Sequence, residues 1–79
     1  MKAKKVDEIF VDMVVKRLRE LRNERSYSQE YVIEHTHLDI SRYESGNSIP
    51  TLLSILKLCN LYNITLEEFF TSFDYPPKK

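Results

Sequence analysis

The sequence has very few of the residues that interrupt helices or crosslink a small fold. It contains a single glycine, three prolines that all lie in the second half, and one cysteine. So few breakers argue against a turn-rich β fold and favour helices. A lone cysteine excludes an intrachain disulfide and a cysteine-based zinc cluster. Cys59 lies between leucines, and we expect it to be an inert buried thiol.

Long apolar runs are also missing from the sequence. No stretch approaches the roughly 20 apolar residues that a membrane-spanning helix needs. The basic start, residues 1–5, is not followed by an uninterrupted apolar segment or a cleavage site, which argues against a signal peptide. These features predict a cytoplasmic chain with no membrane partner.

The formal net charge is zero, which gives no general indication of nucleic-acid binding. The charge is unevenly distributed, however. Residues 1–25 carry eight basic and five acidic residues, whereas residues 26–50 carry only Arg42 against four acidic residues. Any contact with DNA would therefore need basic residues of the first helix beside the element that reads the bases.

The overall amino-acid composition is typical of one small folded domain. Hydrophobic residues make up 42% and charged residues 30% of 79 residues, which fits a globular chain and excludes a disordered one. We expect a single domain over residues 1–79, with its core in about 13–71 and a loose tail at 74–79. A domain of this size gains stability from idealised helix packing or from dimerisation.

The spacing of the apolar residues predicts five helices. Residues recurring every three or four positions predict a long first helix over 6–24. Ser28 and Thr51 are expected N-caps, and Gly46 is an expected left-handed helix end. Thr65 and Glu68 form a capping box that opens a short last helix. The remaining helices are expected at 29–36, 38–45 and 52–62.

The same spacing identifies the expected core. The first helix has more apolar residues than one packing face needs, so a partner chain is expected to cover part of it. In the fourth helix the expected core residues are Leu52, Leu53, Ile55, Leu56, Cys59 and Leu61.

Five ordered segments carry a resemblance to a known family. They are Val14-x-x-Arg17-Leu18-Arg19-x-Leu21-Arg22, Tyr27-Ser28-Gln29-Glu30, Ile40-Ser41-Arg42-Tyr43-Glu44-Ser45-Gly46, Pro50-Thr51-Leu52-x-x-Ile55 and Ile64-Thr65-Leu66-Glu67-Glu68-Phe69-Phe70. In this order and spacing they resemble the lambda-repressor/Cro-like (XRE-type) helix-turn-helix family of bacterial and phage transcriptional regulators. The resemblance covers about residues 13–71.

The resemblance implies an all-α, five-helix DNA-binding domain with an extended first helix. It further implies a homodimeric regulator, expected to be a repressor, that binds double-stranded DNA and reads the major groove with its third helix. Gln29 would contact DNA near the backbone, Ser41 and Arg42 would lie on the reading helix, and Asn47 and Ser48 would touch the sugar-phosphate backbone.

The resemblance also assigns a structural ion pair between the first and third helices, for which the matching residues are Arg17 and Glu44. The other basic residues of the first helix, Lys16, Arg19, Arg22 and Arg25, are expected to be mostly solvated.

The sequence departs from the family between the second and third helices, where it is about three residues shorter. The loss falls on the start of the reading helix, which normally touches bases. Thr36, His37 and Asp39 are the expected replacement tip. Asp39 would repel phosphate, but it could accept from a cytosine amino group or cap the shortened helix.

Other functions are less consistent with these residues. His35 and His37 are two positions apart and do not share a helical face, and no third ligand is evident, so no metal site is expected. No glycine-rich phosphate loop and no nucleophile–base pattern occurs, so neither an enzyme nor a cofactor is expected.

The second hypothesis is a protein-interaction module, for example antitoxin-like, that keeps the fold with weak or no DNA binding and has a toxin or regulator as partner. For the homodimer, two surfaces are open: the long first helix, and the last helix with its aromatic tail, which contains Phe69, Phe70, Phe73 and Tyr75.

Overall fold

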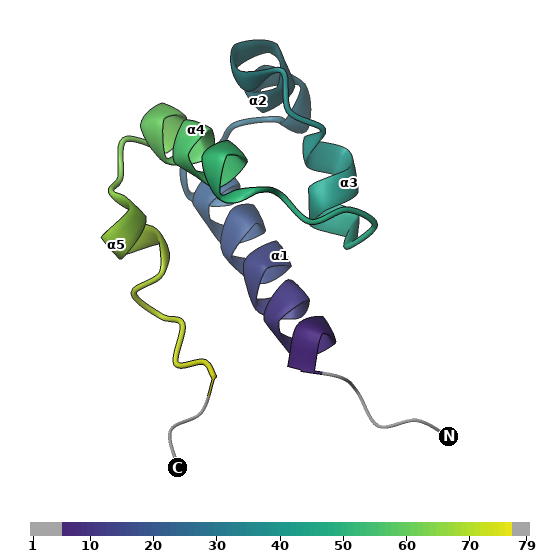
Figure 1. The fold of residues 1–79 in the computed structure, drawn as a ribbon. Helices are drawn as coiled ribbons and strands as arrows, with labels where there is room; N and C mark the ends of the chain where they lie inside the picture. Colours follow the sequence, from purple (N-terminus) through teal and green to yellow (C-terminus); the bar gives the residue numbers. More distant parts are fainter. Residues whose placement is uncertain (1–5, 77–79) are drawn as a thin grey trace.

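The computed structural model describes residues 6–76, which form five helices and, within that range, no strand (Figure 1). The helices are α1 (Val6–Glu24), α2 (Gln29–Thr36), α3 (Ile40–Ser45), α4 (Leu52–Tyr62) and α5 (Leu66–Phe69). The all-α, five-helix architecture predicted from the sequence is confirmed. The basic residues 1–5 and the end of the expected tail, 77–79, lie outside the described residues.

Helix ends are set by the capping residues that the sequence indicated. The side chains of Ser28 and Thr51 accept hydrogen bonds from backbone N–H groups in the first turns of α2 and α4. Thr65 and Glu68 make both bonds of the capping box at α5. Gly46 ends α3 with φ of 82° in the left-handed region. One boundary differs, because α3 begins at Ile40 rather than at residue 38.

The core lies where α1 meets the four shorter helices. Its buried members, listed along the chain, are Val14, Leu18, Leu21, Val32, Ile40, Ile55, Leu58, Cys59, Tyr62 and Phe69. Burial raises the pKa of the Cys59 thiol, which agrees with the inert buried thiol expected from the sequence.

The fourth helix buries only part of the expected set, namely Ile55 and Cys59, with Leu61 packed against the core. Leu52, Leu53 and Leu56 are 65%, 64% and 40% exposed, whereas Leu58 and Tyr62 are buried. Ile55, Leu58, Cys59 and Tyr62 recur every three or four residues and therefore share one side of the helix. The expectation that Leu52, Leu53 and Leu56 supply the core was wrong, because α4 is apolar around most of its circumference and its sequence does not say which side faces α1.

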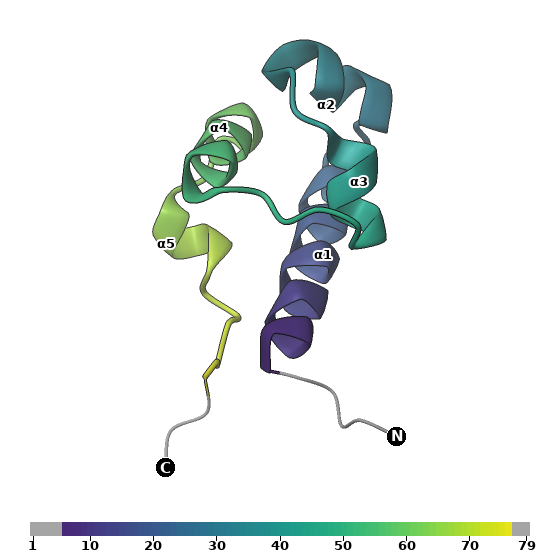
Figure 2. The same ribbon diagram turned by 45° about the vertical axis from the view of Figure 1, so that its right-hand side comes forward.

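The C-terminal segment after α5 returns to the first helix. Phe73 packs against Phe10 of α1, with ring centroids 5.9 Å apart, and against Phe69 and Phe70. Figure 2 shows α4 and α5 together on one side of the molecule, with α2 and α3 on the other. Among the described helices, none is long and apolar enough to cross a membrane.

Candidate nucleic-acid interface

A three-residue turn, residues 37–39, joins α2 to α3 and makes the helix-turn-helix unit. His37 adopts left-handed φ of 60° and donates its N–H to the Ile33 carbonyl at 2.7 Å. Thr36 is only 8% exposed; its hydroxyl donates to the Val32 carbonyl and accepts from the Leu38 N–H. The expectation that Thr36 forms part of an exposed tip was therefore wrong, because the tight turn requires its hydroxyl inside.

Asp39 is the N-cap of α3. Its carboxylate accepts from the Arg42 backbone N–H at 3.4 Å and from the Ser41 hydroxyl at 3.1 Å. Of the two roles considered for Asp39, the structure places it as a cap. An exposed negative charge therefore lies at the start of α3, where a phosphate would be repelled.

The six residues of α3 divide into a buried and an exposed side. Ile40 and Glu44 point into the molecule, while Ser41, Arg42 and Ser45 are exposed. Ser45 was not among the expected site residues, although it follows Ser41 by four positions and must share its face. The exposed side of α3 thus presents two hydroxyls and one guanidinium.

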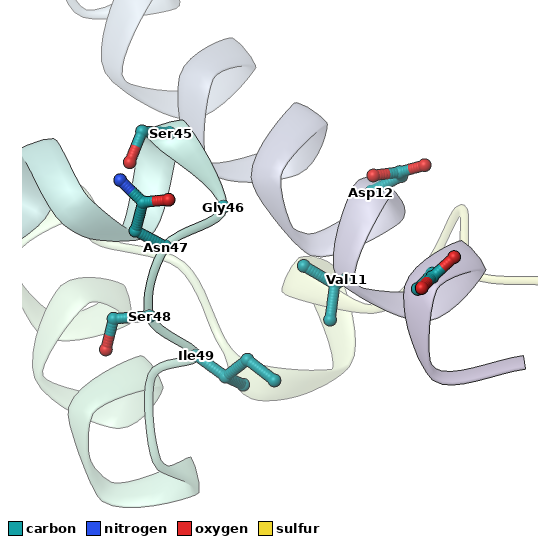
Figure 3. Close-up of a pocket in the computed structure, with 8 residues that line it drawn as sticks. Val11, Asp12, Ser45, Gly46, Asn47, Ser48 and Ile49 are labelled. Atoms are coloured by element: carbon teal, nitrogen blue, oxygen red, sulfur yellow. The ribbon is translucent and has the colours of Figure 1, made fainter. Parts of the chain in front are cut away.

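Asn47 and Ser48 follow Gly46, the residue that ends α3, and extend this surface. Their backbone N–H groups both donate to the Arg42 carbonyl, at 3.0 and 3.3 Å. The 45–49 segment also lines a pocket of about 700 Å³ opposite Val11 and Asp12 of α1. Figure 3 shows Ile49 extending toward Val11, with the Ser48 hydroxyl directed away from it.

Glu44 is held by a side-chain network at the back of this surface. Arg22 donates from Nε to Oε2 at 2.7 Å and from Nη2 to Oε1 at 2.8 Å. Gln29 donates from Nε2 to Oε1 at 3.0 Å. The bidentate ion pair between Arg22 and Glu44 joins α1 to α3. The hydrogen bond from Gln29 connects the start of α2 to the same carboxylate.

The network shifts the pKa of both charged partners. Burial by itself would raise the pKa of the Glu44 carboxyl, but hydrogen bonds from Arg22 and Gln29 outweigh it and leave that pKa below its ordinary value. The hydrogen bond to Glu44 raises the pKa of Arg22 against the opposing effect of burial. Both groups are therefore charged at neutral pH.

The expected pairing of Glu44 with Arg17 was wrong. Arg17 instead donates to two carbonyls of α5, from Nη2 to Glu68 at 2.8 Å and from Nε to Phe69 at 2.9 Å. Arg22 lies five positions after Arg17 in the helix, which turns its side chain by roughly 140° around the axis. Consequently Arg22 faces α3, and Arg17 faces the last carbonyls of α5.

The expectation that the other arginines of the first helix are mostly solvated was wrong for Arg22 and Arg25, which are half-buried, whereas Arg19 is exposed as expected. Arg19 donates to the Glu44 carbonyl at 2.9 Å. Arg25 donates to the Tyr62 carbonyl at 2.9 Å, and its guanidinium lies 5.3 Å from the centre of the Tyr62 ring. These hydrogen bonds link α3 and α4 to α1. Arg42 is the exposed arginine of α3.

The two histidines lie on different parts of the turn. His35 is exposed, stacks on Tyr31 with centroids 4.0 Å apart, and has Nδ1 2.8 Å from the Tyr31 carbonyl. His37 is exposed at the turn. Within residues 6–76 no three histidine, cysteine or acidic side chains are grouped as a metal site.

Comparison with known proteins identifies the same unit. Residues 15–74 match the family described as "helix-turn-helix domain". Comparison with curated proteins and with solved structures finds no match. The matched segment covers the second half of α1 and all of α2 to α5, and it agrees with the resemblance to XRE-type regulators. This chain therefore belongs to the helix-turn-helix domain family, a family of DNA-binding regulatory domains.

Proposed function

We propose that this chain is a sequence-specific regulator, a repressor, that binds double-stranded DNA as a homodimer and reads the major groove with α3. The observation that carries the proposal is the exposed side of α3. Ser41, Arg42 and Ser45 stand together on it, and Asn47 follows at its end. Serine hydroxyls can contact several base edges, and an arginine fork suits the two acceptors of guanine.

Gln29 and Ser48 complete the proposed surface. Gln29 is the first residue of α2 and half-buried, with one amide N–H given to Glu44. The other amide N–H remains for a phosphate, and the first turn of α2 favours an anion. Ser48 lies next to Asn47, and its hydroxyl is proposed to contact the sugar-phosphate backbone. His37 and Asp39 mark the edge of the surface, with Asp39 limiting how closely a phosphate approaches.

The test is selection of bound sequences from random duplex DNA, followed by fluorescence anisotropy on the enriched site. We expect an inverted repeat with half-sites about 34 Å apart. Arg42→Ala is expected to weaken binding about tenfold or more, since a bidentate contact to guanine contributes about 1–3 kcal/mol. Lys57→Ala is the matched control, because Lys57 is an exposed cation on α4. No enrichment by the folded chain would contradict the proposal.

One observation favours a second candidate, a protein-interaction module with a partner protein such as a toxin or regulator. Arg17, Arg19, Arg22 and Arg25 are all engaged within the fold, so α1 adds little positive charge to a reading surface whose sequence segment is acidic. If no sequence is enriched from the random DNA library, the result favours this second candidate.

A further inference from the structure

The carboxylate of Asp39 uses one of its two oxygens to hold the start of α3. Oδ1 accepts from the Arg42 backbone N–H at 3.4 Å and from the Ser41 hydroxyl at 3.1 Å. Among residues 6–76, both hydrogen bonds to this carboxylate reach Oδ1, and the Asp39 side chain is exposed. The second oxygen, Oδ2, therefore keeps its acceptor capacity for a group outside the fold.

The Ser41 hydroxyl is also left as an acceptor. A hydroxyl carries one proton and two lone pairs, and Ser41 gives its proton to the Asp39 carboxylate. A hydrogen bond to a charged acceptor is roughly twice as strong as one between neutral groups, so this proton is not easily given to another partner. The two exposed side chains of Asp39 and Ser41 thus present acceptors and no donor, and we name them the acceptor pair.

We propose that the acceptor pair is a specificity determinant that selects a base with an exocyclic amino group, cytosine or adenine. This inference rests on the proposed function and names the base edge that the start of α3 would contact. In the major groove, cytosine N4 and adenine N6 carry hydrogen-bond donors, whereas guanine and thymine present only acceptors. Acidic side chains accept from cytosine N4 in such contacts, so cytosine is the favoured partner.

Guanine and thymine would be rejected at the same position. Their acceptor atoms would face the oxygens of Asp39 and Ser41, so both sides would lose their water without gaining a hydrogen bond. The carboxylate charge adds to this penalty, because the acceptor atoms of the bases carry partial negative charge. An unfavourable contact with the wrong base contributes to specificity in addition to the favourable contact with the right one.

Arg42 complements the acceptor pair in charge and in hydrogen bonding. It is exposed and directly follows Ser41 in α3. Its guanidinium has donors only, and these suit the O6 and N7 acceptors of guanine. The start of α3 therefore offers acceptors and then donors within a few residues. We expect each half-site to contain a cytosine or adenine close to a guanine.

Ser45 differs from Ser41 in how its proton is held. Its hydroxyl donates to the Arg42 carbonyl at 3.0 Å, and the backbone N–H groups of Asn47 and Ser48 donate to the same oxygen. A carbonyl oxygen has two lone pairs, so Ser45 can release its proton without leaving that oxygen unpaired. Ser45 can therefore either donate to a base or accept from one, and we expect no preference for amino groups from it.

The test is selection from random duplex DNA with the wild-type chain and with Asp39→Asn, followed by anisotropy titrations on the selected sites. Asparagine is a good N-cap, and its amide replaces one carboxylate oxygen by a donor of similar shape. At the position whose base preference this substitution changes, the wild-type chain is expected to prefer cytosine or adenine about fivefold or more. Asp39→Asn is expected to lose that preference.

Two controls separate the hydrogen bond from a general effect of charge or of a lost hydroxyl. Glu34→Gln removes an exposed carboxylate from α2 and is expected to leave every base preference unchanged. Ser41→Ala is expected to weaken the preference for cytosine or adenine about threefold, whereas Ser45→Ala is expected to leave it intact. Circular dichroism establishes that each variant is folded, and Ser41→Ala replaces Asp39→Asn if the latter is unfolded.

The possible results distinguish this inference from the proposed function. A wild-type preference for guanine or thymine at that position overturns the inference, as does a folded Asp39→Asn chain that keeps every wild-type preference. In either case a selected inverted repeat leaves the proposed function standing. If the folded wild-type chain enriches no sequence, the proposed function is overturned and the inference with it.

Discussion

Glu44 links three parts of the sequence through one carboxylate. It is 3% exposed, and it accepts two hydrogen bonds from Arg22 and one from Gln29. A buried carboxylate with this many donors does not stabilise the fold by charge alone. Its effect is to fix the distance between α1, the start of α2 and the end of α3, which are the elements that carry the proposed DNA surface.

The first prediction concerns the removal of this charge. Glu44→Gln is expected to lower the free energy of unfolding by about 3 kcal/mol at neutral pH, because it leaves the Arg22 guanidinium largely buried and unpaired. Urea unfolding measures the change. Glu34→Gln, at an exposed position of α2, is the control and is expected to change stability by less than about 0.5 kcal/mol. Equal effects in the two variants would contradict the role given to Glu44.

The second prediction concerns acid. The folded-state pKa of Glu44 lies below its ordinary value of 4.5. Its contribution to stability is therefore complete above about pH 5 and is lost as the pH falls through the folded-state pKa. Thermal unfolding across the acid range is expected to show a larger loss of stability in the wild-type chain than in Glu44→Gln. If the thermal stability of the two proteins falls in parallel with pH, the prediction is contradicted.

At the scale of the element, α3 is a short helix that depends on its two ends. Asp39 caps its start, and Gly46 ends it in the left-handed region, with N–H bonds to the carbonyls of Arg42 and Tyr43. A six-residue helix has too few internal hydrogen bonds to be stable by itself. The caps and the buried side chains of Ile40 and Glu44 therefore hold α3 in place.

The third prediction tests the end of this helix. A Cβ atom at Gly46 would meet nothing within 4 Å, so only the backbone conformation with φ of 82° opposes a side chain there. Gly46→Ala is expected to lower stability by about 1 kcal/mol. Gly46→Asn is expected to lower it less, because asparagine tolerates the left-handed region. Thermal unfolding followed by circular dichroism compares the two variants, and an alanine variant as stable as the wild type would contradict the prediction.

At the scale of the whole molecule, the arginines of α1 link this helix to the shorter helices through hydrogen bonds. Arg17 holds α5, Arg22 holds α3, and Arg25 holds the end of α4. Together with Arg19, these arginines are half of the basic residues in the first 25 positions, and their guanidinium groups are used for contacts within the fold. Among the described residues of that segment, Lys16 is the remaining cation.

The fourth prediction follows from this distribution of charge. If the dimer binds DNA with one or two phosphate contacts per copy, the slope of log K against log salt is expected to be shallow, about −2 to −4. Anisotropy titrations on the selected site at several salt concentrations measure this slope. A slope steeper than about −8 would show that many more cations reach the backbone than the described surface offers.

The sequence by itself determined the five helices, most of their boundaries and the caps at Ser28, Thr51 and Thr65, because caps and apolar spacing depend on neighbours within a few positions. It also indicated the family, because five segments keep the family's order although the connection between the second and third helices is shorter. Only the tertiary structure decided that Glu44 pairs with Arg22 rather than Arg17, and that α4 buries Leu58 while exposing Leu53. Those outcomes depend on how each helix is rotated about its axis against the others, which packing between residues far apart in the sequence determines.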